Sequence, residues 1–210
     1  MSDKDANWRF AEEFVVESDA LLSARQNSTE LGIEAVSPAV GAQISVIAAA
    51  AGARNMIEIG TGVGVSGLCL FEGAPEAILT SIDIEADHLQ QAKKTFSEAR
   101  VPSNRVRLIT GRALDVLPRM NENSYDVVLV DADPGTVIEY VEHGLRLVRA
   151  GGTVVVTHAL WKGRVADPAA RDETTVGYRT LLKEIAGSDA VISALSPVGD
   201  GVLQLVKRRE

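Results

Sequence analysis

The sequence predicts an α/β fold in which a mostly parallel, doubly wound sheet carries helices on both faces. From Asn55 onward, short apolar runs alternate with longer amphipathic segments. The apolar runs are continuous rather than alternating, which is typical of strands that are buried on both faces. Alternation of strands and helices along a chain favours parallel strands joined by helical crossovers.

Five apolar runs are the predicted parallel strands. They are NMIEI at residues 55–59, ILTSID at 78–83, RVRLIT at 105–110, YDVVLVDA at 125–132 and GTVVVT at 152–157. The segments between them have helical spacing. Residues 85–100 place Leu89, Ala92 and Phe96 on one stripe, and residues 136–148 repeat this pattern.

The two ends of the chain differ from this alternating centre. Residues 8–25 are predicted to form one helix with Phe10, Phe14 and Leu21 on one face, and a second helix begins at Pro38 and ends near Gly52. A charged, proline-containing loop leads to a last helix at about Val176. Residues 189–207 contain two strand-like runs joined by the turn-rich SPVGDG, and two strands joined in this way are expected to be antiparallel neighbours.

Length and composition indicate one domain over residues 1–210, with a helical N-terminal cap at 1–52 and a sheet core at 53–210. The chain has 210 residues, of which 46% are hydrophobic, and a net charge of -8. That acidic balance argues against nucleic acid and anionic membranes as partners. No apolar stretch approaches the length of a membrane span, and the N-terminal residues contain no apolar signal core, so a cytoplasmic protein is expected. The single cysteine, Cys69, excludes a disulfide framework and a cysteine-rich zinc site.

The first predicted strand ends in a glycine-rich loop, EIGTGVGVSG, at residues 58–67. Gly62, Gly64 and Gly67 fit the dinucleotide pattern GxGxxG, and Asp83 follows about 20 residues later, where an acid can hold ribose hydroxyls. NAD and S-adenosylmethionine (SAM) both carry an adenosine, so both suit this loop. Glu58 favours SAM, because a carboxylate there would attract a methionine amine and repel a pyrophosphate. The alternatives are that Glu58 is a solvated acid and that Asp83 only caps the next helix.

These motifs resemble those of the small class I O-methyltransferases of the caffeoyl-CoA and catechol type, over almost the whole chain. The matching stretches are EIGTGVGVS, SIDIEADHLQQAK, GRALDVLP, VLVDADP, GGTVVVTHALWKGRVADP and SPVGDGVLQLVK. The resemblance implies a Rossmann-like, seven-stranded sheet whose last strand is antiparallel, and a homodimer. It also implies SAM as cofactor, with these positions binding it: Val36, Glu58, Gly60, Thr61, Gly62, Ser66, Asp83, Ile84, Ala113 and Asp131.

The chain departs from the family at the expected divalent-cation site. Typical members supply an acid at the position of Asp131 and an Asp-Asn pair after the fifth strand, where this chain has Thr157 and His158. The family lysine that is read as a catalytic base is replaced by Pro134. Mg²⁺ prefers oxygen ligands in octahedral geometry, so we expect no metal here. His158 could be a general base, a metal ligand or a structural residue at the end of a strand.

The sequence therefore predicts a SAM-dependent O-methyltransferase that acts on a small hydroxylated acceptor, aromatic acceptors included, without a divalent cation. The predicted catalytic residues are His158 and Asp131. Two other functions compete with this one: a protein that binds SAM without turnover, and a nicotinamide oxidoreductase. Several further residues have two interpretations or a surface role. Trp161 and Tyr140 either wall the site or pack structurally, Arg164 fixes a loop or clamps substrate, and Lys162, His88 and His143 are expected at the surface.

Overall fold

The computed structural model describes residues 3–209, so that Met1, Ser2 and Glu210 of the predicted 1–210 domain lie outside the described residues. Within residues 3–209, seven strands form one sheet in the order β3-β2-β1-β4-β5-β7-β6. They are β1 (Asn55–Ile59), β2 (Ile78–Asp83), β3 (Val106–Thr110), β4 (Tyr125–Val130), β5 (Val148–Val156), β6 (Val191–Ser196) and β7 (Val202–Lys207). Strand β7 is antiparallel to both of its neighbours, β5 and β6, which confirms the predicted closing hairpin.

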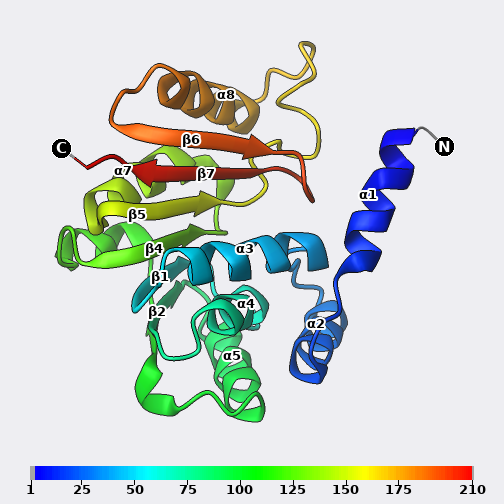
Figure 1. Cartoon of the computed structure of the whole chain (residues 1–210), viewed down its shortest axis with the longest axis vertical. Helices are drawn as coiled ribbons and strands as arrows, with labels where there is room; N and C mark the ends of the chain where they lie inside the picture. The colour runs from blue at the N-terminus through cyan, green and yellow to red at the C-terminus, as the bar shows by residue number, and fades with distance from the viewer. Residues whose placement is uncertain (1–2, 210) are drawn as a thin grey trace.

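The described part of the chain forms eight α-helices. They are α1 (Asp3–Phe14), α2 (Asp19–Leu31), α3 (Pro38–Ala50), α4 (Val65–Gly73), α5 (Ala86–Glu98), α6 (Ala113–Val116), α7 (Val137–Leu147) and α8 (Glu173–Ala186). Helices α3, α4 and α5 lie on one side of the sheet, and α7 and α8 lie on the other (Figure 1).

Successive residues of the central strands belong to two different cores. Met56 of β1 and Leu129 of β4 pack with α2 to α5, whereas Ile57 and Val130 pack with α6 to α8. Side chains of a strand alternate between the two faces of its sheet, so a strand that is covered on both faces must be apolar throughout. This explains why the strand sequences are continuous apolar runs.

The predicted helix over residues 8–25 is wrong, because the structure divides it into α1 and α2. Residues 15–18 are not helical, and the hydroxyl of Ser18 accepts a hydrogen bond from Leu21 N as the N-cap of α2. Leu21 is buried, but Phe10 and Phe14 on α1 remain 71% and 76% exposed. Helix α1 extends away from the sheet (Figure 1), so these side chains do not share the face of Leu21.

Helix α8 begins at Glu173, three residues before its predicted start. The Asp172 carboxylate caps it by accepting a hydrogen bond from Thr175 N at 3.0 Å. No helix within residues 3–209 is long and apolar enough to cross a membrane.

The carboxyl ends of β1, β4 and β5 lie side by side and continue the pairing one residue beyond the strands. Asp131 N donates to Ile59 O at 2.8 Å, and Thr157 N donates to Val130 O at 3.1 Å. Gly60 N donates to Ile82 O of β2 at 2.9 Å. The first residues after β1, β4 and β5 therefore meet at one edge beside the end of β2, which is where open α/β sheets bind ligands.

Candidate functional site

A cavity of about 600 Å³ opens at this edge of the sheet. Its wall includes residues from the glycine loop, from the end of β2, from the start of α6 and from the ends of β4 and β5. The predicted site residues in the wall are Gly60, Thr61, Gly62, Ser66, Asp83, Ile84, Ala113, Asp131 and His158. The structure thus brings together nine of the predicted residues, although they are spread over about 100 positions of the sequence.

The glycine loop lies close to the end of β4. Gly60 has φ +90, and a Cβ placed on it would lie 1.9 Å from the carbonyl oxygen of Asp131. Only glycine allows this conformation and this close approach together. The loop therefore runs directly beside Asp131, and both border the cavity.

Asp83 fixes the shape of the glycine loop from the end of β2. Its Oδ2 accepts hydrogen bonds from Thr61 N and Gly62 N, both at 2.9 Å, and its Oδ1 accepts one from Glu85 N at 2.9 Å. A carboxylate offers about four acceptor positions, so three backbone donors leave room for a ligand hydroxyl. His88, expected at the surface, also lines the cavity and lies with Nδ1 3.5 Å from Asp83 Oδ1. His88 lies in the first turn of the helix that follows Asp83, and this position in the sequence could have predicted its place at the cavity.

Glu58 lies behind the cavity wall rather than in it. The carboxylate is fully buried and accepts hydrogen bonds from Ser66 Oγ at 2.7 Å and Ser81 Oγ at 2.5 Å. Burial raises the pKa of Glu58 from 4.5 to about 8, although both hydroxyls oppose the shift. The expected direct contact to a ligand amine does not fit this position, because Glu58 reaches the cavity wall through Ser66 and through Ser81, whose hydroxyl is bonded to that of Thr61. The alternative of a solvated acid is also wrong.

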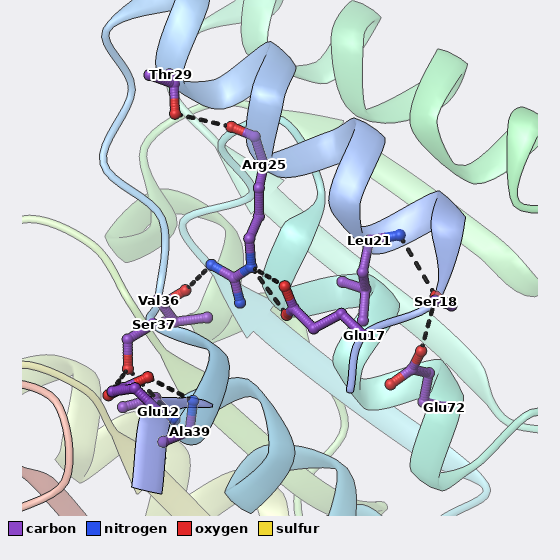
Figure 2. A network of polar contacts seen from close by, with 11 residues as sticks. Glu12, Glu17, Ser18, Leu21, Arg25, Thr29, Val36, Ser37, Ala39 and Glu72 are labelled. Atoms are coloured by element: carbon purple, nitrogen blue, oxygen red, sulfur yellow. Dashed lines mark hydrogen bonds and ion pairs between the residues drawn. The ribbon is translucent and has the colours of Figure 1, made fainter. Parts of the chain in front are cut away.

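The segment between α2 and α3 forms another part of the wall, through Ile33, Glu34 and Ala35. Val36, predicted to contact the cofactor, does not line the cavity, and its side chain is buried. Its carbonyl oxygen instead accepts a hydrogen bond from Arg25 Nη1 (Figure 2). Sequence reasoning missed this anchoring role of Arg25.

A network of polar contacts holds this segment in place (Figure 2). Arg25 Nε donates to both carboxylate oxygens of Glu17, at 2.8 and 2.7 Å. On the other side, Ser37 Oγ and Ala39 N donate to the two carboxylate oxygens of Glu12, at 2.7 and 2.9 Å. The end of the wall segment that leads into α3 is therefore tied to charged side chains of the N-terminal region.

His158 lies between two carboxylates at the end of β5. Its Nε2 is 3.6 Å from Asp131 Oδ1, and its Nδ1 is 3.4 Å from Asp200 Oδ2. The neighbouring Thr157 Oγ1 donates a hydrogen bond to Asp131 Oδ1 at 2.6 Å. Burial raises the pKa of Asp131, while the Thr157 hydroxyl and His158 act in the opposite direction. An imidazole in this position can accept a proton and keep the resulting charge next to two anions.

The residues at the expected cation site do not fit Mg²⁺. Asp131 is the one carboxylate among the three corresponding positions, and the Thr157 hydroxyl donates a hydrogen bond to that carboxylate. The third position offers an imidazole nitrogen instead of an oxygen, whereas Mg²⁺ requires octahedral oxygen ligands. Within the described part of the chain, no group of three or more His, Cys, Asp or Glu side chains is arranged to hold a metal ion.

Aromatic side chains border the cavity beyond His158. Trp161 lines it and stacks on Tyr178 of α8 at 5.8 Å between ring centroids, and Tyr140 lines it as well. Lys162 also borders the cavity, with Nζ 3.5 Å from Glu34 Oε2. Arg164 is bound to Asp172 at 2.6 Å, which confirms its loop-fixing interpretation.

Known proteins of one kind resemble this chain over nearly its full length. Residues 12–209 match the family model described as O-methyltransferase. A Mycobacterium marinum relative, provisionally named an O-methyltransferase, is 46% identical over 198 residues, which cover 94% of this chain and 88% of the relative.

Two solved structures share the fold and were determined with the cofactor or its product. The O-methyltransferase TomG from Streptomyces achromogenes, involved in tomaymycin synthesis, was solved in complex with SAM. It is 30% identical with a TM-score of 0.86, and all of both chains is covered. An O-methyltransferase from Bacillus cereus, solved with S-adenosylhomocysteine (SAH), is 26% identical with a TM-score of 0.84, over 96% of this chain and 97% of that one.

Proposed function

This chain belongs to the O-methyltransferase family, and from that premise we propose that it methylates a hydroxyl group of a small acceptor without using a divalent cation. The sheet is Rossmann-like and the enzyme is SAM-dependent, as its family is. The binding protein without turnover and the nicotinamide oxidoreductase are accordingly set aside.

We assign the cofactor to the cavity wall described above. The glycine loop, with Gly60, Thr61 and Gly62, lines the part of the cavity that we assign to the methionine part. Asp83 accepts ribose hydroxyls with the acceptor capacity that its backbone partners leave, and Ala113 borders the adenine. Val36 and Glu58, which lie outside the wall, act indirectly by supporting Ala35 and Ser66.

The position of His158 carries the proposal for the chemistry. Methyl transfer from a sulfonium is a direct displacement, so the protein must orient the acceptor and remove its hydroxyl proton. His158 lines the cavity next to Asp131, at the strand end where a metal-binding set is missing. We assign His158 as the general base and Asp131 as its partner, with Trp161 as a wall for an aromatic acceptor.

Turnover with and without a chelator tests the cation-independent reaction. Catechol and 3,4-dihydroxybenzoate serve as probes, with SAM as methyl donor and product followed by mass spectrometry. We expect the rates in 1 mM EDTA and in 1 mM Mg²⁺ to be equal within the uncertainty of the assay. Loss of turnover in EDTA that Mg²⁺ restores would contradict the proposal.

The role of His158 is tested separately with His158→Ala. We expect a loss of turnover of about 100-fold or more, the usual contribution of general acid–base catalysis. The SAH-induced rise in melting temperature should be unchanged, because His158 is not assigned to cofactor binding. Unaltered turnover in this variant would remove His158 from the mechanism.

We also infer that the enzyme is a homodimer. The support is the apolar surface of the N-terminal region, where Phe10, Phe14 and Val16 are more than two-thirds exposed. Light scattering on a size-exclusion column measures the mass directly, and Phe10→Ser with Phe14→Ser should shift a dimer toward the monomer. A monomer in the unmodified protein would contradict this inference.

A further inference from the structure

We propose that Asp200 is a positioning residue that holds the imidazole of His158 with Nδ1 protonated and Nε2 free to accept a proton. This inference rests on the proposed role of His158 as a base. Asp200 lies more than 40 residues after His158, in the turn between β6 and β7.

The turn that carries Asp200 is bonded to the loop that carries His158. Ala159 N donates to Gly201 O at 3.0 Å, and Leu160 N donates to Asp200 O at 2.9 Å. Lys162 N donates to both carboxylate oxygens of Asp200, at 2.6 and 2.7 Å. The Asp200 carboxylate is therefore held in a fixed position relative to the loop backbone that follows His158.

The backbone of His158 is also held in an unusual conformation. His158 has φ +54, and Trp161 and Lys162, with φ +46 and +53, are left-handed as well. Left-handed residues other than glycine are uncommon and persist where surrounding contacts impose them. The bonds to the turn supply these contacts, so that the ring of His158 is directed to a defined place between Asp131 and Asp200.

The orientation of the ring determines which nitrogen faces each acid. Nδ1 is 3.4 Å from Asp200 Oδ2, and Nε2 is 3.6 Å from Asp131 Oδ1 in the cavity wall. In neutral imidazole one nitrogen donates and the other accepts. Each nitrogen has a carboxylate beside it, and that of Asp200 is the nearer one. The nearer carboxylate holds the proton on Nδ1, and the lone pair on Nε2 is then available to the acceptor hydroxyl.

The proton and electron balance follows from this arrangement. The acceptor O–H bond breaks, and its proton goes to Nε2. The acceptor oxygen forms a bond to the methyl carbon as the bond from that carbon to sulfur breaks, and the electron pair stays on sulfur to give SAH. The imidazolium is then held between Asp131 and Asp200 until it releases the proton to water.

Other charged groups in the cavity wall near the His158 ring are Glu34, Asp133 and Lys162.

Asp200→Asn tests the positioning role, because asparagine keeps the size and one oxygen acceptor for Lys162 N but removes the charge. The exposed Asp189→Asn, at the other end of the same hairpin, is the matched control. Nitrogen-15 NMR of the imidazoles reports the tautomer of His158, whose signals are assigned by their loss in His158→Gln. We expect the Nδ1–H form in the unmodified enzyme and in the control, and a mixture of both tautomers in Asp200→Asn.

Kinetics with 3,4-dihydroxybenzoate provides the second measurement. We expect kcat to fall about 10-fold or more in Asp200→Asn, with an unchanged KM for SAM and an unchanged SAH-induced thermal shift. An Nε2–H tautomer in the unmodified enzyme, or the same tautomer in Asp200→Asn, would overturn the proposal. Loss of the SAH-induced shift in Asp200→Asn would also overturn it, since it would indicate a general structural role. The tautomer is measured without turnover, so it decides the role of Asp200 even if His158→Ala retains full activity and the base assignment fails.

Discussion

Replacing Gly60 by alanine should destabilise the protein far more than the same replacement at Gly52. Both glycines have positive φ, +90 and +55. A Cβ on Gly52 would have no atom within 4 Å, whereas a Cβ on Gly60 would lie 1.9 Å from Asp131 O. Gly52→Ala therefore measures the cost of the backbone conformation alone, and Gly60→Ala adds a collision with the backbone of the neighbouring chain segment.

The size of the two effects follows from these geometries. A left-handed alanine costs roughly 1–2 kcal/mol, and the reduced entropy of the unfolded chain returns about 0.4–1 kcal/mol. Gly52→Ala should thus lower the free energy of unfolding by about 1 kcal/mol. Gly60→Ala must also move the Asp131 carbonyl by about 1 Å to reach an allowed contact, which strains the Asp131 N to Ile59 O hydrogen bond. We expect a total loss of about 3–4 kcal/mol.

Urea unfolding followed by circular dichroism measures both values. For a chain of this size, about 1 kcal/mol corresponds to roughly 2–4 °C in Tm, so the variants should differ by about 5 °C or more. Gly60→Ala should also reduce the SAH-induced thermal shift, because the displaced carbonyl belongs to Asp131. Equal stabilities of the two variants, within about 1 kcal/mol, would refute the reasoning from the close approach.

Three further predictions concern buried or partly buried charges. The pKa of Glu58 is raised from 4.5 to about 8, so the protonated form is favoured in the folded protein, and stability falls as pH rises through this range. Urea unfolding between pH 5 and pH 8 should show that the free energy of unfolding falls by about 1.4 kcal/mol per pH unit because of this group. Glu58→Gln should abolish this dependence on pH. A slope unchanged by the substitution would contradict the assigned pKa. Asp83→Ala should weaken SAH binding by about 10-fold or more in calorimetry, because the glycine loop loses its acceptor, whereas the exposed Asp87→Ala should bind normally. Arg25→Met should lower the free energy of unfolding by about 3 kcal/mol, because the buried side chain of Glu17 then loses its ion-pair partner. Adding Glu17→Gln to the same chain should restore part of that loss. No recovery in the double variant would argue against a stabilising Arg25–Glu17 pair.

The sheet could be predicted from the sequence because each strand carries its own evidence. A run such as VVLV can be apolar throughout only if both faces of the strand are covered. The turn-rich SPVGDG predicts that the two strands it joins form a hairpin. The N-terminal helices could not be predicted as well. Phe10 and Phe14 have helical spacing with Leu21, but the Ser18-Asp19 cap that divides the helix is a local signal that the spacing hides.

The site was predictable where a residue follows a strand, and less so where a side chain could turn either way. Asp83 ends β2, Asp131 directly follows β4 and His158 lies two residues after β5, and all three border the cavity. Glu58 lies within β1. The period of two along a strand does not reveal that the hydroxyls of Ser66 and Ser81 donate hydrogen bonds to its buried carboxylate. The place of Asp200 next to His158 depends on how the hairpin returns to β5, which is a tertiary contact without a local sequence signal.

The position of β7 between β5 and β6 has a consequence for the order of assembly during synthesis. Strand β5 has no neighbour on its outer side until Val202–Lys207 pairs with it, although β6 is made earlier. A nascent chain that stops before Val202 can form β1 to β5 and their helices, with one edge of the sheet unpaired. That edge ends at His158, and Asp200 reaches it only with the returning hairpin. On a ribosome, the cofactor wall can therefore form before the part of the site that we assign to proton removal, and a chain that is still being made cannot yet be a working enzyme.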